Sequence, residues 1–143
     1  MRPITVADVM SKPVVVIGVN NTLREAAKEM MDKGVGSLVV VDEKGDVVGI
    51  ITERDVVRAV AEGKDLNAPV SEVMTPDVLT VSPETSVLKA IETMKMHNVR
   101  HLPVASDDEI VGMVSLKDLA FAVAAEMILK RIYEMLKEEL SEL

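Results

Sequence analysis

The sequence of 143 residues contains an internal duplication, and this feature constrains the fold more than any other. Residues 6–10, Val-Ala-Asp-Val-Met, recur as Val-Ser-Glu-Val-Met at residues 70–74. The correspondence continues at a constant offset, with Ala26 matching Ala90, and it resumes after a short gap near Asp107. A repeat of this length with one short gap indicates a duplicated structural unit rather than chance similarity between two segments.

The apolar patterns of each half predict the order strand, helix, strand, strand, helix. The first helix has the clearest signals, because Thr22 and Glu25 have the spacing of a capping box and Gly34 can take the left-handed conformation that ends a helix. Short apolar runs suit buried strands. The predicted strands are residues 14–17, 38–41 and 47–51 in the first half, and residues 78–81, 102–105 and 110–114 in the second. The closing helices begin at Thr52 and Ser115.

The duplication places the first repeat at residues 1–63 and the second at residues 64–124, with residues 63–69 joining them. Residues 125–143 form a helical extension with an apolar stripe on one side. This stripe consists of Ala125, Ile128, Leu129, Ile132, Leu136 and Leu140. Either the extension packs on its own domain, or it pairs with another chain. We favour pairing, because the stripe is longer than a small module easily covers.

Composition excludes several classes of protein. No apolar run has the roughly 18 residues that a membrane span needs, and no signal-like stretch precedes Asp8. The chain has no cysteine, which fits a reducing compartment, and we expect a cytoplasmic protein. The net charge of -8 and the presence of only one Phe and one Tyr disfavour a nucleic-acid-binding regulator and an anionic membrane surface.

The sequence gives little support for catalysis. It contains no phosphate-binding Gly-rich loop, no dinucleotide fingerprint and no nucleophile elbow. His97 and His101 have the spacing of two metal ligands on one helix, but Asn98 is expected to end that helix between them. We therefore expect neither an enzyme nor a metal site.

One motif occurs at the same place in both halves. Residues 49–55 and 112–118 each contain Gly, two apolar residues, Thr or Ser, two variable residues and Asp. In one interpretation, the hydroxyl and the carboxylate only cap a helix. In the other, the helix start receives a phosphate and the carboxylate accepts hydrogen bonds from the two hydroxyls of a ribose. The presence of two copies favours the second interpretation.

From residue 6 to residue 123 the sequence resembles a pair of CBS domains, also called a Bateman module. The resemblance rests on the Val-x-x-Val-Met openings, on residues 34–40 and 98–104, and on the two Gly-x-x-[Thr/Ser]-x-x-Asp motifs. It implies an α/β (α+β) fold in which two β-α-β-β-α repeats pack about a pseudo-twofold axis, here followed by a C-terminal helix. It also implies two clefts that bind adenosine compounds, and dimers that form a disc of four repeats.

The resemblance assigns roles to individual residues. Asp55 and Asp118 would hold ribose, each working with the first strand of the opposite repeat. The phosphate-binding residues would be Thr52, Arg54, Ser115, Lys117, Arg100 and His101. The residues beside adenine would be Val16, Ile17, Leu79 and Thr80. Gly36 and Ser37 replace Arg100 and His101 in the first repeat, so we expect unequal clefts and the stronger ligand contacts at Asp118.

These observations predict a stand-alone regulatory module that senses energy state or a metabolite by binding AMP, ADP or ATP. No cofactor is expected apart from this regulatory ligand. Two alternatives remain open at this point: a sensor of S-adenosylmethionine-type ligands, and a protein-interaction module with empty clefts that docks an unidentified target. We also expect a homodimer through the module helices. The small side chains predicted at that surface are Ala26, Ala27, Val57, Ala120 and Val123.

Overall fold

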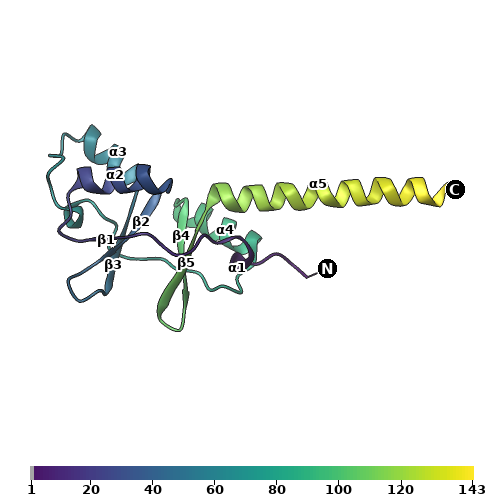
Figure 1. The fold of residues 1–143 in the computed structure, drawn as a ribbon, viewed down its shortest axis with the longest axis horizontal. Helices are drawn as coiled ribbons and strands as arrows, with labels where there is room; N and C mark the ends of the chain where they lie inside the picture. The colour runs from purple at the N-terminus through teal and green to yellow at the C-terminus, as the bar shows by residue number, and fades with distance from the viewer. Residues whose placement is uncertain (1) are drawn as a thin grey trace.

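The computed structural model describes residues 2–143; Met1, the start of the predicted first repeat, lies outside the described residues. The predicted order of elements is found in full in the first half, and in the second half without its first strand (Figure 1). The first half contains β1 (Val16–Gly18), α2 (Leu23–Lys33), β2 (Ser37–Val41), β3 (Val47–Thr52) and α3 (Glu53–Ala61). The second contains α4 (Val87–His97), β4 (His101–Ser106), β5 (Glu109–Ser115) and α5 (Leu116–Ser141). Two short helices, α1 (Val6–Val9) and η1 (Val70–Glu72), precede the halves.

The predicted helix boundaries are confirmed by cap geometry. Thr22 and Glu25 form the capping box at the start of α2, and Gly34 ends that helix with a φ of 66°. Asn98 takes the same left-handed conformation after α4, with a φ of 53°. These caps satisfy backbone groups that each helix leaves unpaired, so the two repeats begin and end their first helix in corresponding places.

The predicted strand over residues 78–81 is wrong for most of its length. β1 pairs in parallel with β2, which pairs with β3, but the second sheet consists of β4 and β5 alone. Only Val81 bridges to β4, at Val104. In the first half, Val39 donates its N–H to the Val15 carbonyl at 2.9 Å. The residue that corresponds to Val39 is Pro103, which has no N–H, so this ladder bond cannot form in the second half.

Each half completes its core with a segment from the other half. Val6 is fully buried in a cluster with Val87, Leu102 and Leu119 of the second half. Val70, the corresponding residue, is fully buried in the cluster of the first half. Figure 1 accordingly shows α1 beside α4 rather than beside the first sheet. The two halves are therefore interlocked, and the exchange is reciprocal.

A pair of short bridges fixes this exchange. Ser11 and Met113 donate to one another's carbonyls at 2.8 and 3.0 Å. Thr75 and Ile50 form the equivalent pair, also at 2.8 and 3.0 Å. The segment before each first strand thus lies against the last strand of the opposite half, which relates the two halves by an approximate twofold axis.

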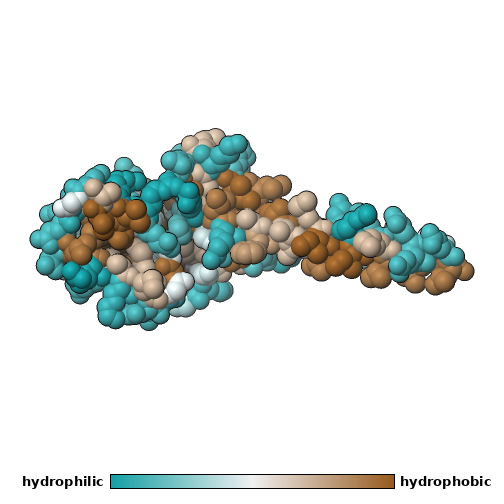
Figure 2. Space-filling view, turned by 90° about the horizontal axis from the view of Figure 1, so that it is seen from above, coloured by the Kyte–Doolittle hydropathy of each residue, from teal (hydrophilic) through white to brown (hydrophobic). Residues whose placement is uncertain are grey.

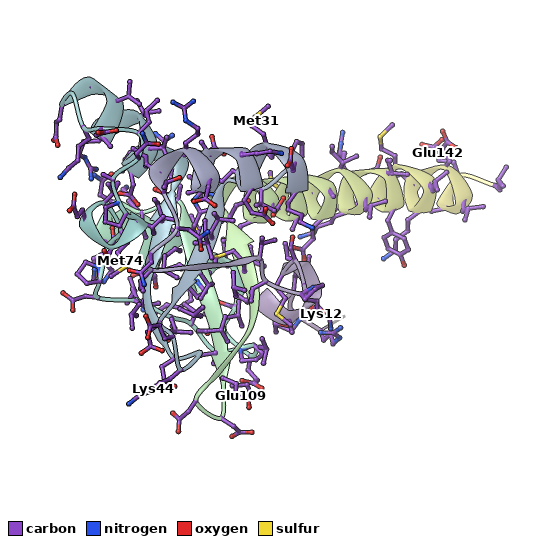
Figure 3. The ribbon with its side chains drawn as sticks, turned by 60° about the vertical axis from the view of Figure 1, so that its left-hand side comes forward. Lys12, Met31, Lys44, Met74, Glu109 and Glu142 are labelled. Atoms are coloured by element: carbon purple, nitrogen blue, oxygen red, sulfur yellow. The ribbon has the colours of Figure 1, made fainter. Side chains whose placement is uncertain are left out.

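The C-terminal helix leaves the module. Leu119 is the buried residue of α5, and every residue from Ala124 to Leu143 is exposed. Figure 1 shows this part of α5 projecting beyond the rest of the chain, and Figure 2 shows hydrophobic side chains along it. In Figure 3, Glu142 lies at the far end of the helix, away from both hairpins. The alternative in which the extension packs on its own domain is therefore wrong. Among residues 2–143, no helix is long and apolar enough to span a membrane.

Candidate ligand-binding clefts

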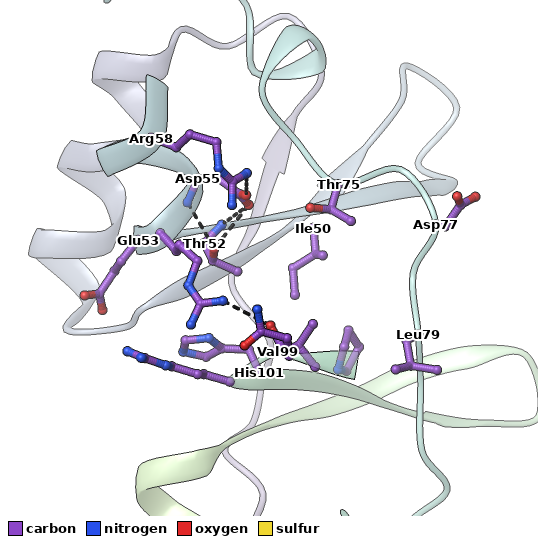
Figure 4. Close-up of a pocket in the computed structure, with 14 residues that line it drawn as sticks. Ile50, Thr52, Glu53, Asp55, Arg58, Thr75, Asp77, Leu79, Val99 and His101 are labelled. Atoms are coloured by element: carbon purple, nitrogen blue, oxygen red, sulfur yellow. Dashed lines mark hydrogen bonds and ion pairs between the residues drawn. The ribbon is translucent and has the colours of Figure 1, made fainter. Parts of the chain in front are cut away.

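Two clefts lie between the halves, and each contains one of the duplicated aspartates. The Asp55 cleft has a volume of about 230 Å³. Its lining residues are Ile50, Thr52, Glu53, Arg54, Asp55, Arg58, Thr75, Asp77, Leu79, Asn98, Val99, Arg100, His101 and Pro103. Figure 4 shows Thr75, on the chain that follows η1, pointing toward Thr52 and Asp55, with Leu79 further along the same segment and Asp77 pointing away. This cleft therefore combines a helix start from one half with a strand-like segment from the other.

The Asp118 cleft is the counterpart, and it is wider, with a volume of about 1170 Å³. The segment before β1 lines it with Ser11, Pro13, Val14 and Val15, and β5 and α5 contribute Met113, Ser115, Leu116, Lys117, Asp118 and Ala120. The remaining lining residues are Ala27, Met30, Met31, Gly34, Val35, Gly36, Ser37, Glu53, Val56, Val57, Arg100 and His101. In both clefts the structure thus brings the aspartate together with the first apolar segment of the opposite repeat.

The glycine of each motif allows the opposite half to approach. A Cβ at Gly49 would lie 2.8 Å from the Thr75 carbonyl oxygen and 2.7 Å from the Met74 sulfur. A Cβ at Gly112 would lie 2.6 Å from the Met10 sulfur. All three distances are shorter than a Cβ contact allows, so a side chain at either position requires its neighbour to move, and at Gly49 that neighbour includes a backbone carbonyl. Spacing alone gave no reason for this glycine, because the contact is formed by the other half.

Asp55 is already engaged in the structure. Its side chain accepts hydrogen bonds from the Thr52 N–H at 2.9 Å and the Thr52 hydroxyl at 3.1 Å. The guanidinium of Arg58 approaches the other carboxylate oxygen at 3.3 Å (Figure 4). The residue is only 5% exposed. Asp55 therefore fits both interpretations of the motif, because its carboxylate caps α3 and also lines the cleft.

Asp118 has a different environment. Its N–H donates to the Ser115 hydroxyl at 3.1 Å, which caps the start of α5. Within residues 2–143, no side chain or backbone N–H forms a hydrogen bond to its carboxylate. Phe121 occupies the position that corresponds to Arg58, and it is 67% exposed. The Asp118 carboxylate thus remains available to a ligand, whereas Arg58 occupies the equivalent group.

The basic residues are distributed differently from the expectation. Arg100 and His101 stand at the start of β4 and line both clefts, so they do not distinguish the Asp118 cleft from the Asp55 cleft. Arg54 donates to the Asn98 carbonyl at 3.0 Å and so binds the end of α4. Lys117 lines the Asp118 cleft but not the Asp55 cleft. The clefts are unequal, but the difference comes from Arg58 and Phe121 rather than from Arg100 and His101.

Glu53 is a cleft residue that the sequence reasoning did not identify. It lines both clefts, and its carboxylate and the His101 ring enclose Gly36, which has no room for a Cβ. Burial lowers the pKa of His101 from its ordinary value of 6.5, and the nearby carboxylates of Glu53 and Asp118 oppose this shift. The only signal in the sequence was the position of Glu53 directly after Thr52, the hydroxyl residue of the motif. The corresponding residue in the second repeat is Leu116.

Three of the residues expected beside adenine lie elsewhere. Leu79 lines the Asp55 cleft, and Val15 is its counterpart in the Asp118 cleft. Val16 is 52% exposed and lines neither cleft, because side chains alternate along a strand. Ile17 packs into the core under α2, and Thr80 also lines neither cleft. Of the four residues expected beside adenine, only Leu79 lines a cleft, and the apolar residues of the segment before β1 that line the other cleft are Val14 and Val15.

Comparison with known proteins agrees with this arrangement. The sequence model of the CBS domain matches residues 6–62 and again residues 70–125. The chain belongs to the CBS-domain family. Its relatives include an uncharacterized 17.7 kDa protein of Acidianus ambivalens, 44% identical over 82% of this chain and 72% of that protein. The CBS domain-containing protein YhcV of Bacillus subtilis is 38% identical over 81% of this chain and 83% of its own length.

Solved CBS-domain pairs have the same fold. The CBS domain pair of protein MJ0100, in complex with 5'-methylthioadenosine and S-adenosyl-L-methionine, has a TM-score of 0.80 at 30% identity, covering 87% of this chain and 99% of that chain. A CBS domain protein from Pyrobaculum aerophilum, complexed with AMP, has a TM-score of 0.78 at 32% identity, covering 88% and 99%. CBS-domain pairs are regulatory ligand-binding modules.

One relative carries the name of an enzyme. The L-aspartate semialdehyde sulfurtransferase of Methanocaldococcus jannaschii is 35% identical over 82% of this chain, but the match spans only 23% of that protein. The shared part is therefore the CBS pair, a small fraction of the larger protein.

Proposed function

We propose that this CBS-domain pair is a regulatory module that binds an adenosine nucleotide, with AMP as the leading candidate, in the cleft of Asp118. The observation that carries the proposal is a carboxylate without a partner among the described residues, placed at a helix start and facing the first segment of the opposite half. A carboxylate accepts both hydroxyls of a ribose, and the free N–H groups at a helix start favour a phosphate.

Size and charge support the choice of cleft. Pockets for small ligands typically have volumes of about 300–1,000 Å³. The Asp118 cleft, at about 1170 Å³, can hold a nucleotide, while the Asp55 cleft, at about 230 Å³, is narrower. Lys117 and Arg100 supply positive charge beside Asp118. The apolar side chains of Val14 and Val15 offer a surface for the base.

Regulation follows from the position of the cleft. A ligand that contacts α5 and the segment before β1 contacts both halves at once. Such a ligand changes the arrangement of the halves to the extent that it binds one arrangement more tightly than another. The module thereby converts the concentration of a nucleotide into a change of shape that a target protein can recognise.

A second candidate ligand class is S-adenosylmethionine and its relatives. The observation in its favour is Glu53, a carboxylate that lines both clefts and would attract a sulfonium or an ammonium group but repel a phosphate. Glu53 therefore offers a direct test of ligand class. The Glu53→Gln variant is expected to bind AMP more tightly than the wild type if AMP is the ligand.

Calorimetric titration of the wild type and Glu53→Gln with AMP, ATP, S-adenosylmethionine and 5'-methylthioadenosine tests the proposal. We expect binding of AMP that weakens as salt rises and strengthens in Glu53→Gln. Preference for S-adenosylmethionine, lost in Glu53→Gln, would favour the second class. No heat and no thermal shift with any of these compounds would leave the protein-interaction module as the better description.

We also propose that the module faces pair in a homodimer. Met31 at 82%, Val57 at 66% and Leu88 at 70% exposure lie on α2, α3 and α4. Figure 3 shows Met31 pointing away from the module. Ala26, one of the small residues expected at this surface, is instead fully buried in the first core. Light scattering at tens of micromolar tests the dimer, and a monomeric mass would contradict it.

A further inference from the structure

The exposed part of α5 has the pattern of one strand of a coiled coil. Heptad positions a and d fall on Ala125, Ile128, Ile132 and Met135, and the adjoining e positions are Leu129 and Leu136. We call these six residues the α5 stripe. Residues with this spacing lie on one face of a helix, and such an apolar face is normally buried. The large side chains of the stripe are instead between 47% and 67% exposed. No part of residues 2–143 covers the segment that carries them.

From this pattern we infer that α5 pairs with α5 of a second copy of this chain, and that the two helices run antiparallel. In the antiparallel register, a residues face d residues of the other helix, so Ile132 faces Met135 and Ile128 faces Glu139. The outermost layer joins Ala125 to Glu142. This register overlaps the two helices from Ala124 to Leu143, which is the segment that each chain leaves exposed.

Charge distinguishes the two orientations. The g positions beside the stripe are Arg131 and Glu138. In an antiparallel pair, g positions face g positions, so Arg131 of each helix lies beside Glu138 of the other and the pair forms twice. In a parallel pair, g faces e, which places Arg131 beside Leu136 and Glu138 beside Leu143. The antiparallel orientation alone gives both charged residues an opposite charge.

The charges at the C-terminal end of α5 also favour the antiparallel orientation. Glu138, Glu139 and Glu142 lie within its last turns, whereas Lys130 and Arg131 lie nearer the module. A parallel pair would gather six carboxylates at one end with only the two Lys137 side chains among them, so like charges repel there. An antiparallel pair separates these groups, because each acidic end then lies beside the module-proximal part of the other helix, whose charges balance. The charged residues at the a and d positions that follow the stripe, Glu139 and Glu142, then lie in the two layers nearest each end of the pair.

The contact is separate from the ligand clefts and from the module faces of α2, α3 and α4. It extends over about 30 Å of helix at the helical rise per residue. The inference therefore does not depend on the proposed ligand, and it adds a second contact between chains to the proposed pairing of modules.

Cysteine cross-linking tests the orientation. The natural chain has no cysteine, so one substitution gives one reactive site. If the helices are antiparallel, an oxidised mixture of Ile128→Cys and Glu139→Cys forms the mixed disulfide. Neither variant alone links efficiently, because two copies of residue 128 lie about 16 Å apart along the axis. Disulfides of each variant with itself, or no disulfide in the mixture, would overturn the inference.

Charge reversal tests the register, with sedimentation velocity across a dilution series as the readout. Arg131→Glu is expected to raise the dissociation constant of α5 pairing about tenfold, since two attractive pairs become repulsive. Combining Arg131→Glu with Glu138→Arg restores the pairing. Lys130→Glu is the matched control, because Lys130 occupies the outer f position, and it leaves the assembly unchanged. Equal weakening by Lys130→Glu, or failure of the double variant to restore pairing, would overturn the inference.

Truncation after Val123 separates a folding defect from a pairing defect. Every residue of the removed segment is exposed, so the melting temperature of the module is expected to change little while the number of chains per particle falls. The same number of chains per particle in the full-length and the truncated protein, at every concentration of the dilution series, would overturn the inference.

Discussion

At the scale of single residues, two aspartates from one duplicated motif differ in what surrounds them. Asp55 is held by Thr52 and approached by Arg58, while the carboxylate of Asp118 has no hydrogen-bond donor among residues 2–143. The ion pair at Asp55 has no counterpart at Asp118 because, one turn further along each helix, one repeat has Arg58 and the other Phe121. Duplication alone predicts equal sites, and this substitution makes them unequal.

The two aspartates are expected to respond differently to substitution by alanine. Asp118→Ala should weaken AMP binding by about 1.5–3 kcal/mol, the range for hydrogen bonds to a charged group. Asp55→Ala should weaken AMP binding less and lower the melting temperature more, because it removes the cap of α3 and leaves Arg58 without its ion pair. Calorimetry and thermal melting of both variants measure these effects.

Arg58→Ala provides the control for this difference. Once Arg58 is removed, the Asp55 oxygen that it contacts loses this partner, while the other oxygen still accepts from Thr52. We expect the variant to bind AMP in the Asp55 cleft, which would raise the stoichiometry above that of the wild type. Phe121→Ala, at the corresponding position, should leave the stoichiometry unchanged. Equal loss of affinity in Asp55→Ala and Asp118→Ala would show that Arg58 does not protect its neighbour.

His101 gives the protein a predictable dependence on pH. Its pKa in the folded chain lies below 6.5 because of burial, so the unfolded chain takes up a proton more readily. Burial of His101 therefore does not lower the free energy of unfolding above about pH 6.5, and that free energy falls as pH decreases through this value. The charged groups around the ring are Glu53 and Asp118, which favour the protonated form, and Arg100 and Arg54, which oppose it.

A phosphate bound beside His101 should raise the pKa of the ring, which burial lowers in the free protein. The anion favours the protonated ring, so AMP binding should be accompanied by proton uptake near pH 6.5, and affinity should rise as pH falls from about 8 to about 6. Titration in buffers of different ionisation enthalpy measures the uptake. His101→Gln should remove it while leaving the protonation of AMP itself as the background. Identical uptake in the variant would mean that phosphate binds away from the ring.

At the scale of elements, the helices were predictable and the pairing of strands was not. The caps at Thr22, Gly34 and Asn98 depend on neighbouring residues, so the sequence reveals them. The missing strand at residues 78–80 depends on Pro103, a residue of the adjacent strand that cannot donate to it. The burial of Ile17 in the first core was equally hidden from the sequence, because it depends on packing against α2.

The two motif glycines should differ in how well they tolerate a methyl group. Gly49→Ala brings Cβ within 2.8 Å of a backbone carbonyl, while Gly112→Ala meets only the flexible side chain of Met10 among its nearest atoms. We expect Gly49→Ala to cost about 1–3 kcal/mol of stability, the usual range for overpacking, and Gly112→Ala to cost less. Chemical denaturation of both variants measures the difference. A larger loss for Gly112→Ala would mean that the Met10 side chain cannot move aside.

At the scale of the whole molecule, the order of the sequence and the order of packing differ. The CBS-domain matches cover residues 6–62 and 70–125 along the chain, yet α1 packs with the second core and η1 with the first. The sequence revealed that Val-x-x-Val-Met occurs twice but not that each copy crosses to the other half. Alternation and spacing describe local structure, whereas the crossing depends on contacts between distant residues.

This exchange predicts that a substitution near the N-terminus destabilises the far half of the chain. Val6 and Val70 are both fully buried, and they are equivalent in the two repeats. Val6→Ala removes apolar volume from the core of α4, β4 and β5, and we expect it to cost about 1–3 kcal/mol. Hydrogen exchange should accelerate in those elements and remain slow in α2 and β2. Val70→Ala should give the reverse pattern at a similar cost.

Because the halves share the bridges at Ser11 and Thr75, both variants should still unfold in one cooperative transition. Faster exchange in α2 for Val6→Ala, or two separate transitions, would contradict the interlocked arrangement and indicate that each half folds with its own leading segment.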